Sequence, residues 1–181
     1  MGNINLMKQD APSYGGNVLV KGYLHCLQQC EDLVSRLDAN DYAQSWKGSS
    51  SIGSHICHIL DRVYSLFTGL PRNSVDYDAR NREKDIESSA VSECFAIASI
   101  SRRIRELNSI KLSGQIILVR ETVYYHDAPI RSSSTVEREL MGLVTHSAHH
   151  LAIISILARQ WGQPMDQAFG KAPSALAYER F

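Results

Sequence analysis

Hydrophobic side chains recur every three to four residues in four long stretches of the chain, which is the period of an amphipathic helix. These stretches cover residues 18–38, 52–70, 84–107 and 135–160. The hydroxyls of Ser49–Ser51 and of Thr135 are placed to cap the second and fourth helices, and Gly69 and Gly162 are typical of helix ends. The pattern predicts an all-α fold, a four-helix bundle around one core.

The segment between the third and fourth helices has a different composition. Gln115–Val119 and Thr122–Tyr125 are rich in β-branched and aromatic residues, and His126–Pro129 is typical of a turn. We therefore expect a short β-hairpin between these two helices.

The length of the chain, 181 residues, suits a single domain with a self-sufficient core. Residues 1–15, which include Pro12 and Gly15, are expected to form an N-terminal arm. Residues 16–181 are expected to form the one domain, with the tail beyond residue 160 wrapping around the helices.

The charge balance argues against a polyanionic partner, because 19 basic side chains meet 19 acidic ones without any basic block. Nucleic acid is therefore not expected as a partner. The chain also lacks a signal-like start and any run of about 20 apolar residues, so no membrane association is expected either. We expect a cytoplasmic protein with reduced thiols, in which Cys26 and Cys30 pack in the core of the first helix.

The candidate chemistry lies in the histidines, since five of the seven fall within the second and fourth helical stretches. His146 and His150 are four residues apart and so project from one side of a helix, where they can share an ion. A third ligand, His55 or His58, would complete a typical open metal site. A helical wheel favours His55, which lies nearer the centre of the apolar face. The alternative is a set of hydrogen-bonded core histidines.

Two stretches resemble the metal-binding motifs of the DinB-like (DNA-damage-inducible) proteins, a family of four-helix bundles. Ser51–Asp61 is similar to the family's second-helix motif, in which the ligand precedes two apolar residues and an acid, and this match selects His58. Thr145–Leu151 is similar to the fourth-helix motif and selects His146 and His150. The resemblance thus implies a three-histidine site for a divalent metal ion such as zinc, nickel or iron.

Further segments narrow the resemblance to an uncharacterised bacterial subgroup of this family. They are Val75–Arg82 and Phe169–Leu176, so the likeness covers most of the chain from Val18 onward. Arg62 and Lys171 depart from the pattern near the expected pocket.

The resemblance implies a metal-dependent hydrolase or a thiol S-transferase acting on a small molecule. A protease of the H-E-x-x-H type is disfavoured, because Ser147 stands where that motif has its glutamate. The alternative is a metal-binding dimeric bundle with a stress-related role and no turnover.

Other polar side chains are expected to support the ligands or to line the pocket. They are His55, His149, Asp61, Asp76, Tyr77, Asp78, Arg80 and Arg82. The alternative for Asp61 is a solvated helix charge, and for the Asp76–Arg82 loop it is an ion-paired connection that fixes the helices.

The fourth helix is apolar over more than half of its circumference, with Ile153, Ile154, Ile156 and Leu157 pointing in several directions. We therefore expect a homodimer formed through this helix.

Overall fold

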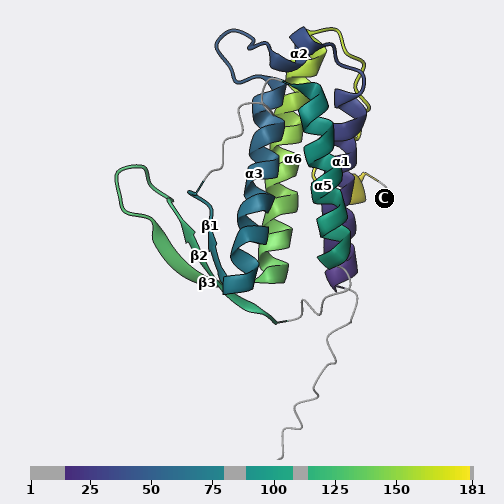
Figure 1. Ribbon diagram of the computed structural model, residues 1–181. Helices are drawn as coiled ribbons and strands as arrows, with labels where there is room; N and C mark the ends of the chain where they lie inside the picture. Colours follow the sequence, from purple (N-terminus) through teal and green to yellow (C-terminus); the bar gives the residue numbers. More distant parts are fainter. Residues whose placement is uncertain (1–14, 80–88, 108–113, 180–181) are drawn as a thin grey trace, which may run out of the picture.

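The computed structural model describes residues 15–79, 89–107 and 114–179 (Figure 1). This part of the chain is mainly helical and carries a small three-stranded sheet. The helices are α1 (Gly15–Val34), α2 (Ala39–Ala43), α3 (Ile52–Gly69), the 3-10 turn η1 (Leu70–Arg72), α5 (Ala90–Leu107), α6 (Val136–Gln160) and α7 (Pro173–Tyr178). The strands are β1 (Ser74–Asp76), β2 (Ile116–Glu121) and β3 (Ile130–Thr135).

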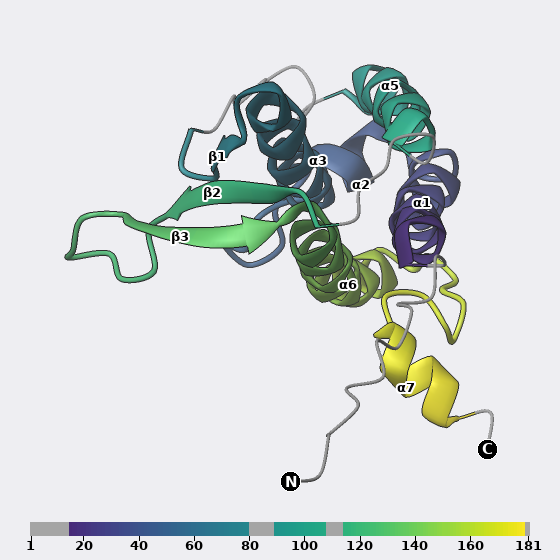
Figure 2. The same cartoon turned by 90° about the horizontal axis from the view of Figure 1, so that it is seen from below.

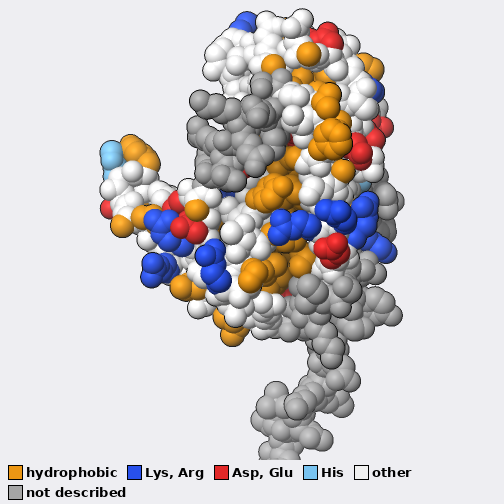
Figure 3. Space-filling model, in the orientation of Figure 1, with side chains coloured by type: hydrophobic (Ala, Val, Ile, Leu, Met, Phe, Trp, Pro, Cys, Tyr) orange, Lys and Arg blue, Asp and Glu red, His pale blue; other side chains and the backbone are white. Residues whose placement is uncertain are grey.

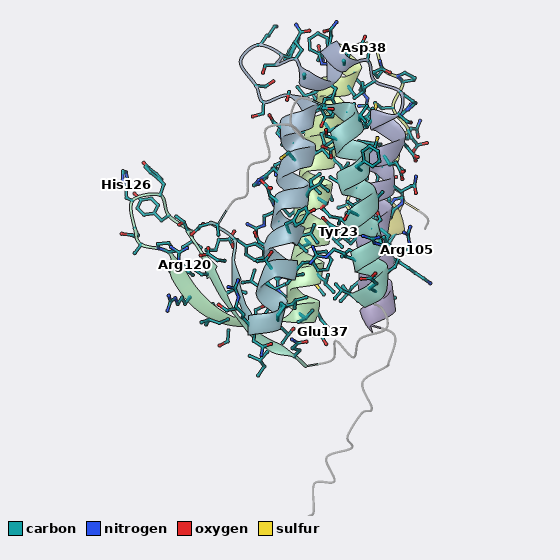
Figure 4. The ribbon with its side chains drawn as sticks, in the orientation of Figure 1. Tyr23, Asp38, Arg105, Arg120, His126 and Glu137 are labelled. Carbon is teal, nitrogen blue, oxygen red and sulfur yellow. The ribbon has the colours of Figure 1, made fainter. Side chains whose placement is uncertain are left out.

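The four long helices lie side by side and enclose the hydrophobic core. α6 packs against α1 and α3, and α5 packs against the same two helices from the other side (Figures 1 and 2). Tyr23 of α1 is fully buried among them (Figure 4), and its hydroxyl donates a hydrogen bond to the carbonyl of Ile59 at 3.3 Å. The apolar faces seen in the sequence therefore meet in one core.

The predicted helix caps are present. The side chain of Ser51 accepts the N–H of Ser54, and that of Thr135 accepts the N–H of Arg138. The first helix begins at Gly15, three residues earlier than expected, and ends at Val34 instead of Asp38, which is the N-cap of the separate helix α2. The third helix is described only from Ala90, so its expected start at residues 84–88 lies outside the described residues.

The sheet differs from the expected hairpin in its second strand. β2 pairs antiparallel with Ile130–Thr135, whereas Thr122–Tyr125 lies in the loop between these strands and is exposed. The N–H and hydroxyl of Thr122 donate to the Asp78 carboxylate at 3.1 and 2.9 Å, so this residue bonds outside the β2–β3 ladder. The prediction for Thr122–Tyr125 was wrong because strand propensity was outweighed by this contact.

A further strand, β1, was not expected, so a three-stranded sheet stands where the sequence predicted only a two-stranded hairpin. β1 pairs in parallel with β2, which makes β2 the central strand. It buries Val75 completely against α3. A Cβ on Gly69 would lie 2.4 Å from the carbonyl oxygen of Ser74, so glycine at this position lets the strand pass close to the end of α3.

The C-terminal segment folds back over α1 and α6, as expected for the tail (Figure 2). Gly170 donates its N–H to the side-chain oxygen of Gln29 at 2.8 Å. A Cβ on Gly170 would lie 2.6 Å from the backbone of α6 at Leu151 and Ala152, and the residue has φ +70°. Glycine is therefore required where the tail meets α6.

α6 is long and apolar enough to cross a membrane by length and composition alone. Half of its most apolar window is buried inside the structure, and the core helix of a soluble protein has the same character. Its packing against α1 and α3 accounts for this composition.

Candidate metal centre

Two antiparallel helices bring the histidines together. On α3, His55 and His58 are about one turn apart, and on α6, His146 and His150 are one turn apart. His55 faces His150, with ring centroids 5.2 Å apart, and His58 faces His146 at 4.9 Å. The residue number rises along α3 and falls along α6 from one pair to the next, so the helices are antiparallel and two layers of imidazoles lie between them.

Three of these rings form a cluster suited to an ion. The nearest ring nitrogens of His58, His146 and His150 all lie within 4.8 Å of one another, and the rings are partly buried. His150 lies 4.8 Å from His58 and 4.6 Å from His146, measured between ring centroids. These are the three residues that the DinB-like resemblance selects.

The donor set fits a divalent transition metal. A tetrahedral zinc ion with Zn–N bonds of about 2.0–2.1 Å needs its nitrogens about 3.4 Å apart. The upper limit of 4.8 Å between the present donor atoms exceeds that by a distance that small side-chain rotations can close. Three histidines leave at least one coordination position for another ligand.

His55 contacts the cluster from outside. Its Nδ1 lies 2.9 Å from Nδ1 of His150, so one of these nitrogens carries the proton and the other accepts it. When Nδ1 of His150 is the donor, its Nε2 is the unprotonated nitrogen that can bind an ion. Metal-binding histidines are commonly oriented through the second ring nitrogen in this way. The helical wheel favoured His55 as the ligand on α3, whereas the structure places His58 in the cluster and His55 behind His150.

The imidazoles of His150 and His55 favour the neutral form. Burial, followed by the neighbouring histidines, lowers the pKa of His150 to about 3. Burial and then His149 lower the pKa of His55. Neutral imidazole is the form that binds metal, so the lowered pKa of His150 suits this ring to bind an ion at neutral pH.

The remaining histidines on or near the helices do not join this cluster. His149 is exposed, and its ring contacts His150 edge-on at 5.2 Å between centroids. His126 lies at the tip of the loop 122–129, which stands away from the helices (Figures 3 and 4). His149 therefore flanks the site, and His126 is remote from it.

Two acidic residues expected near the site, Asp61 and Asp76, lie at the boundary between α3 and the sheet. Asp61 lines a pocket of about 670 Å³ between α3 and β1, together with Tyr64 and Ser65. The Asp76 carboxylate accepts two hydrogen bonds from Arg120, at 2.9 and 2.7 Å.

Asp78 also holds the loop in place, through Thr122 and through an ion pair with Arg120 at 3.7 Å. The ion-paired loop that fixes the connection is therefore present for Asp76 and Asp78. Arg80 and Arg82 lie outside the described residues.

A polar network beside the cluster was not anticipated as a unit. Arg62 forms an ion pair with Glu121, and its guanidinium carbon lies 3.9 Å from the ring centroid of Tyr77. The Tyr77 hydroxyl donates to Glu139 at 2.8 Å. Burial, then the Glu139 charge, raises the pKa of Tyr77 above its ordinary value. The available signal was the spacing of Arg62, which lies one helical turn beyond His58.

Comparison with models of known protein families gives no match, and comparison with curated proteins gives none either. The functional argument therefore depends on the site itself.

Proposed function

We propose that this chain is a DinB-like protein, a four-helix bundle that binds a divalent metal ion through His58, His146 and His150. The observation that carries the proposal is the convergence of three imidazole donors within 4.8 Å of one another at the seam of α3 and α6. The order of the motifs along the chain, with one ligand in the second long helix and two in the fourth, supports the family assignment. The antiparallel pair of strands between the last two long helices would be an addition to such a bundle.

The function that this site supports best is metal-dependent hydrolysis or thiol transfer on a small molecule. A zinc-like ion would supply Lewis acidity and activation of water or of a thiol. The chain's own residues would hold the ion, with burial lowering the pKa of His150 and His55 orienting that ring through their 2.9 Å contact.

The second candidate is a metal-binding dimer without turnover. It is favoured by the apolar side chains that α6 presents outward, since Met141 is 52% exposed and Ile156 is 57% exposed. A second copy packing on this face would bury them. Sedimentation at micromolar concentration tests the dimer, and a monomer would contradict it.

Metal content tests the first proposal. Protein purified without a metal-affinity column should contain about one equivalent of a first-row metal by elemental analysis. The double variant His146→Ala, His150→Ala should lose the metal and keep its helical circular dichroism. The matched control His25→Ala, His126→Ala also removes two histidines, both exposed, and should keep the metal. Equal metal content in the two double variants would refute the site.

Cobalt substitution distinguishes an enzyme with an open coordination position from a structural site whose positions are all filled. If a coordination position is open, added 2-mercaptoethanol should change the visible absorption spectrum of the cobalt protein, because the thiolate becomes a ligand. An unchanged spectrum would favour the non-catalytic alternative.

A further inference from the structure

A pocket of about 400 Å³ lies between the sheet and the helices α3 and α6. Its walls include Arg62 from α3, Glu121 and Ser132 from the sheet, and Arg138 and Gly142 from α6. Neither the three-histidine cluster nor the packing of the core accounts for this hollow.

The strand β3 lines the pocket with hydroxyls instead of hydrophobic side chains. Ile117 and Val119 of β2 are buried, so their side chains face the helices. Ser134 and Ser132 pair directly with these two residues and therefore point to the same face. A strand that covers helices usually presents apolar residues on that face, and small polar ones leave room for a polar ligand.

The pocket begins one helical turn from the histidine cluster. Arg62 follows His58 by four residues on α3, and Gly142 precedes His146 by four residues on α6. Since the two helices are antiparallel, these steps lead in the same direction along the seam, by about 6 Å. A molecule of a few carbon atoms in the pocket would thus reach the cluster.

Two arginines and two glutamates line the pocket, and both carboxylates are already engaged by other side chains. Glu121 is neutralised by Arg62, and Glu139 accepts hydrogen bonds from Tyr77 and Ser134 at 2.8 and 2.5 Å. Arg62 still has its buried Nε–H without an acceptor among the described residues.

Arg138 forms no ion pair within residues 15–79, 89–107 and 114–179. Its Nη1 lies 3.3 Å from the place of a Cβ on Gly142, so the guanidinium extends along α6 toward His146. The donors of Arg62 and Arg138 are therefore available to a ligand at the end of the pocket beside the cluster.

We propose that this pocket binds the carboxylate of a small organic acid, held by Arg62 and Arg138, with the rest of the molecule directed to the histidine cluster. This inference rests on the proposed metal-dependent function for its choice of substrate class. Arginine suits the role because its planar fork binds a carboxylate through two parallel hydrogen bonds. The serine hydroxyls of β3 complete the polar wall.

Binding of simple acids tests the proposal. Benzoate and succinate are titrated by calorimetry or ligand-observed NMR into zinc-loaded and metal-free protein, with benzamide and succinamide as uncharged matches. The acids should bind in both states and the amides should not. Arg138→Gln should weaken acid binding at least about tenfold, the usual effect of losing a charged hydrogen bond. Arg131→Gln, which removes an exposed arginine that does not line the pocket, should leave binding unchanged.

A second variant tests the pocket independently of the arginine charge. Ser132→Leu fills the pocket without removing a charge and should also weaken acid binding, with circular dichroism retained. Equal binding of acids and amides, equal affinities of the Arg138→Gln and Arg131→Gln proteins, or no acid binding would overturn the proposal. Acid binding seen only with zinc and insensitive to Arg138→Gln would also overturn it, since the acid would then be a ligand of the ion. Acid binding that depends on Arg138 in a protein unable to bind metal would refute the proposed function and leave the pocket standing.

Discussion

The buried carboxyl of Glu93 should make folding stability fall as the pH rises. Glu93 of α5 is fully buried, and the hydroxyl of Tyr42 donates to its Oε2 at 2.8 Å. Burial raises the pKa of Glu93 from 4.5 to about 8, against a smaller lowering by the Tyr42 hydrogen bond. Because the folded-state pKa is the higher one, the stabilising contribution is complete below pH 4.5 and is lost as the pH rises through 8.

The magnitude follows from the two pKa values. Each pKa unit corresponds to about 1.4 kcal/mol, so the full loss is about 5 kcal/mol. The part that falls between pH 5.5 and pH 8 is about 3 kcal/mol. Glu93→Gln removes the titrating group and keeps an oxygen for Tyr42. From pH 5.5 to pH 8 the wild type should therefore lose about 3 kcal/mol of unfolding free energy relative to this variant.

Urea unfolding at several pH values measures this difference. A chelator in all samples prevents bound metal from contributing. Glu106→Gln removes an exposed carboxylate from the same helix and is the matched control. Parallel stability curves for the wild type and Glu93→Gln would refute the reasoning.

The remaining predictions concern the ligand support and the tail. His55→Ala should weaken metal binding about 10- to 100-fold in a chelator competition, because His150 loses the partner that orients it, while the neighbouring His149→Ala should have little effect; equal losses would contradict the role of His55. Gly170→Ala should destabilise the protein by about 3 kcal/mol in urea unfolding, since it combines a positive φ with a clash against α6, whereas Gly162→Ala, with positive φ and open space, should cost about 1 kcal/mol. Similar losses for both glycines would show that the tail yields at its contact with α6.

The helices could be predicted from the sequence because their apolar period and their caps are local signals. Ser51 and Thr135 stand next to the apolar runs that they cap, and the structure starts α3 and α6 after them. β1 gave no such signal, since three residues are too few for a period and pair with a strand far along the chain. β3 was missed because serines occupy the face that lines the pocket, so the strand has no alternation of apolar and polar residues.

The histidine cluster could be predicted from the sequence, but its surroundings could not. The spacing of His146 and His150 required only the helical repeat, but the choice between His55 and His58 depended on how α3 is rotated against α6. That rotation is set by packing across the whole core, which a helical wheel of one segment does not contain. The network of Arg62 with Glu121 joins residues far apart in the sequence, and its existence depends on the sheet.

The parallel pairing of β1 with β2 has a consequence for the order of folding. Asp76 and Arg120 are 44 residues apart, and the intervening chain includes the whole of α5. Joining such distant segments carries an entropic cost that local helix formation does not. We therefore expect the sheet to assemble late, after the helices have associated, and to open first when the native state fluctuates, so that access for a small molecule would be governed by the last piece of the protein to form.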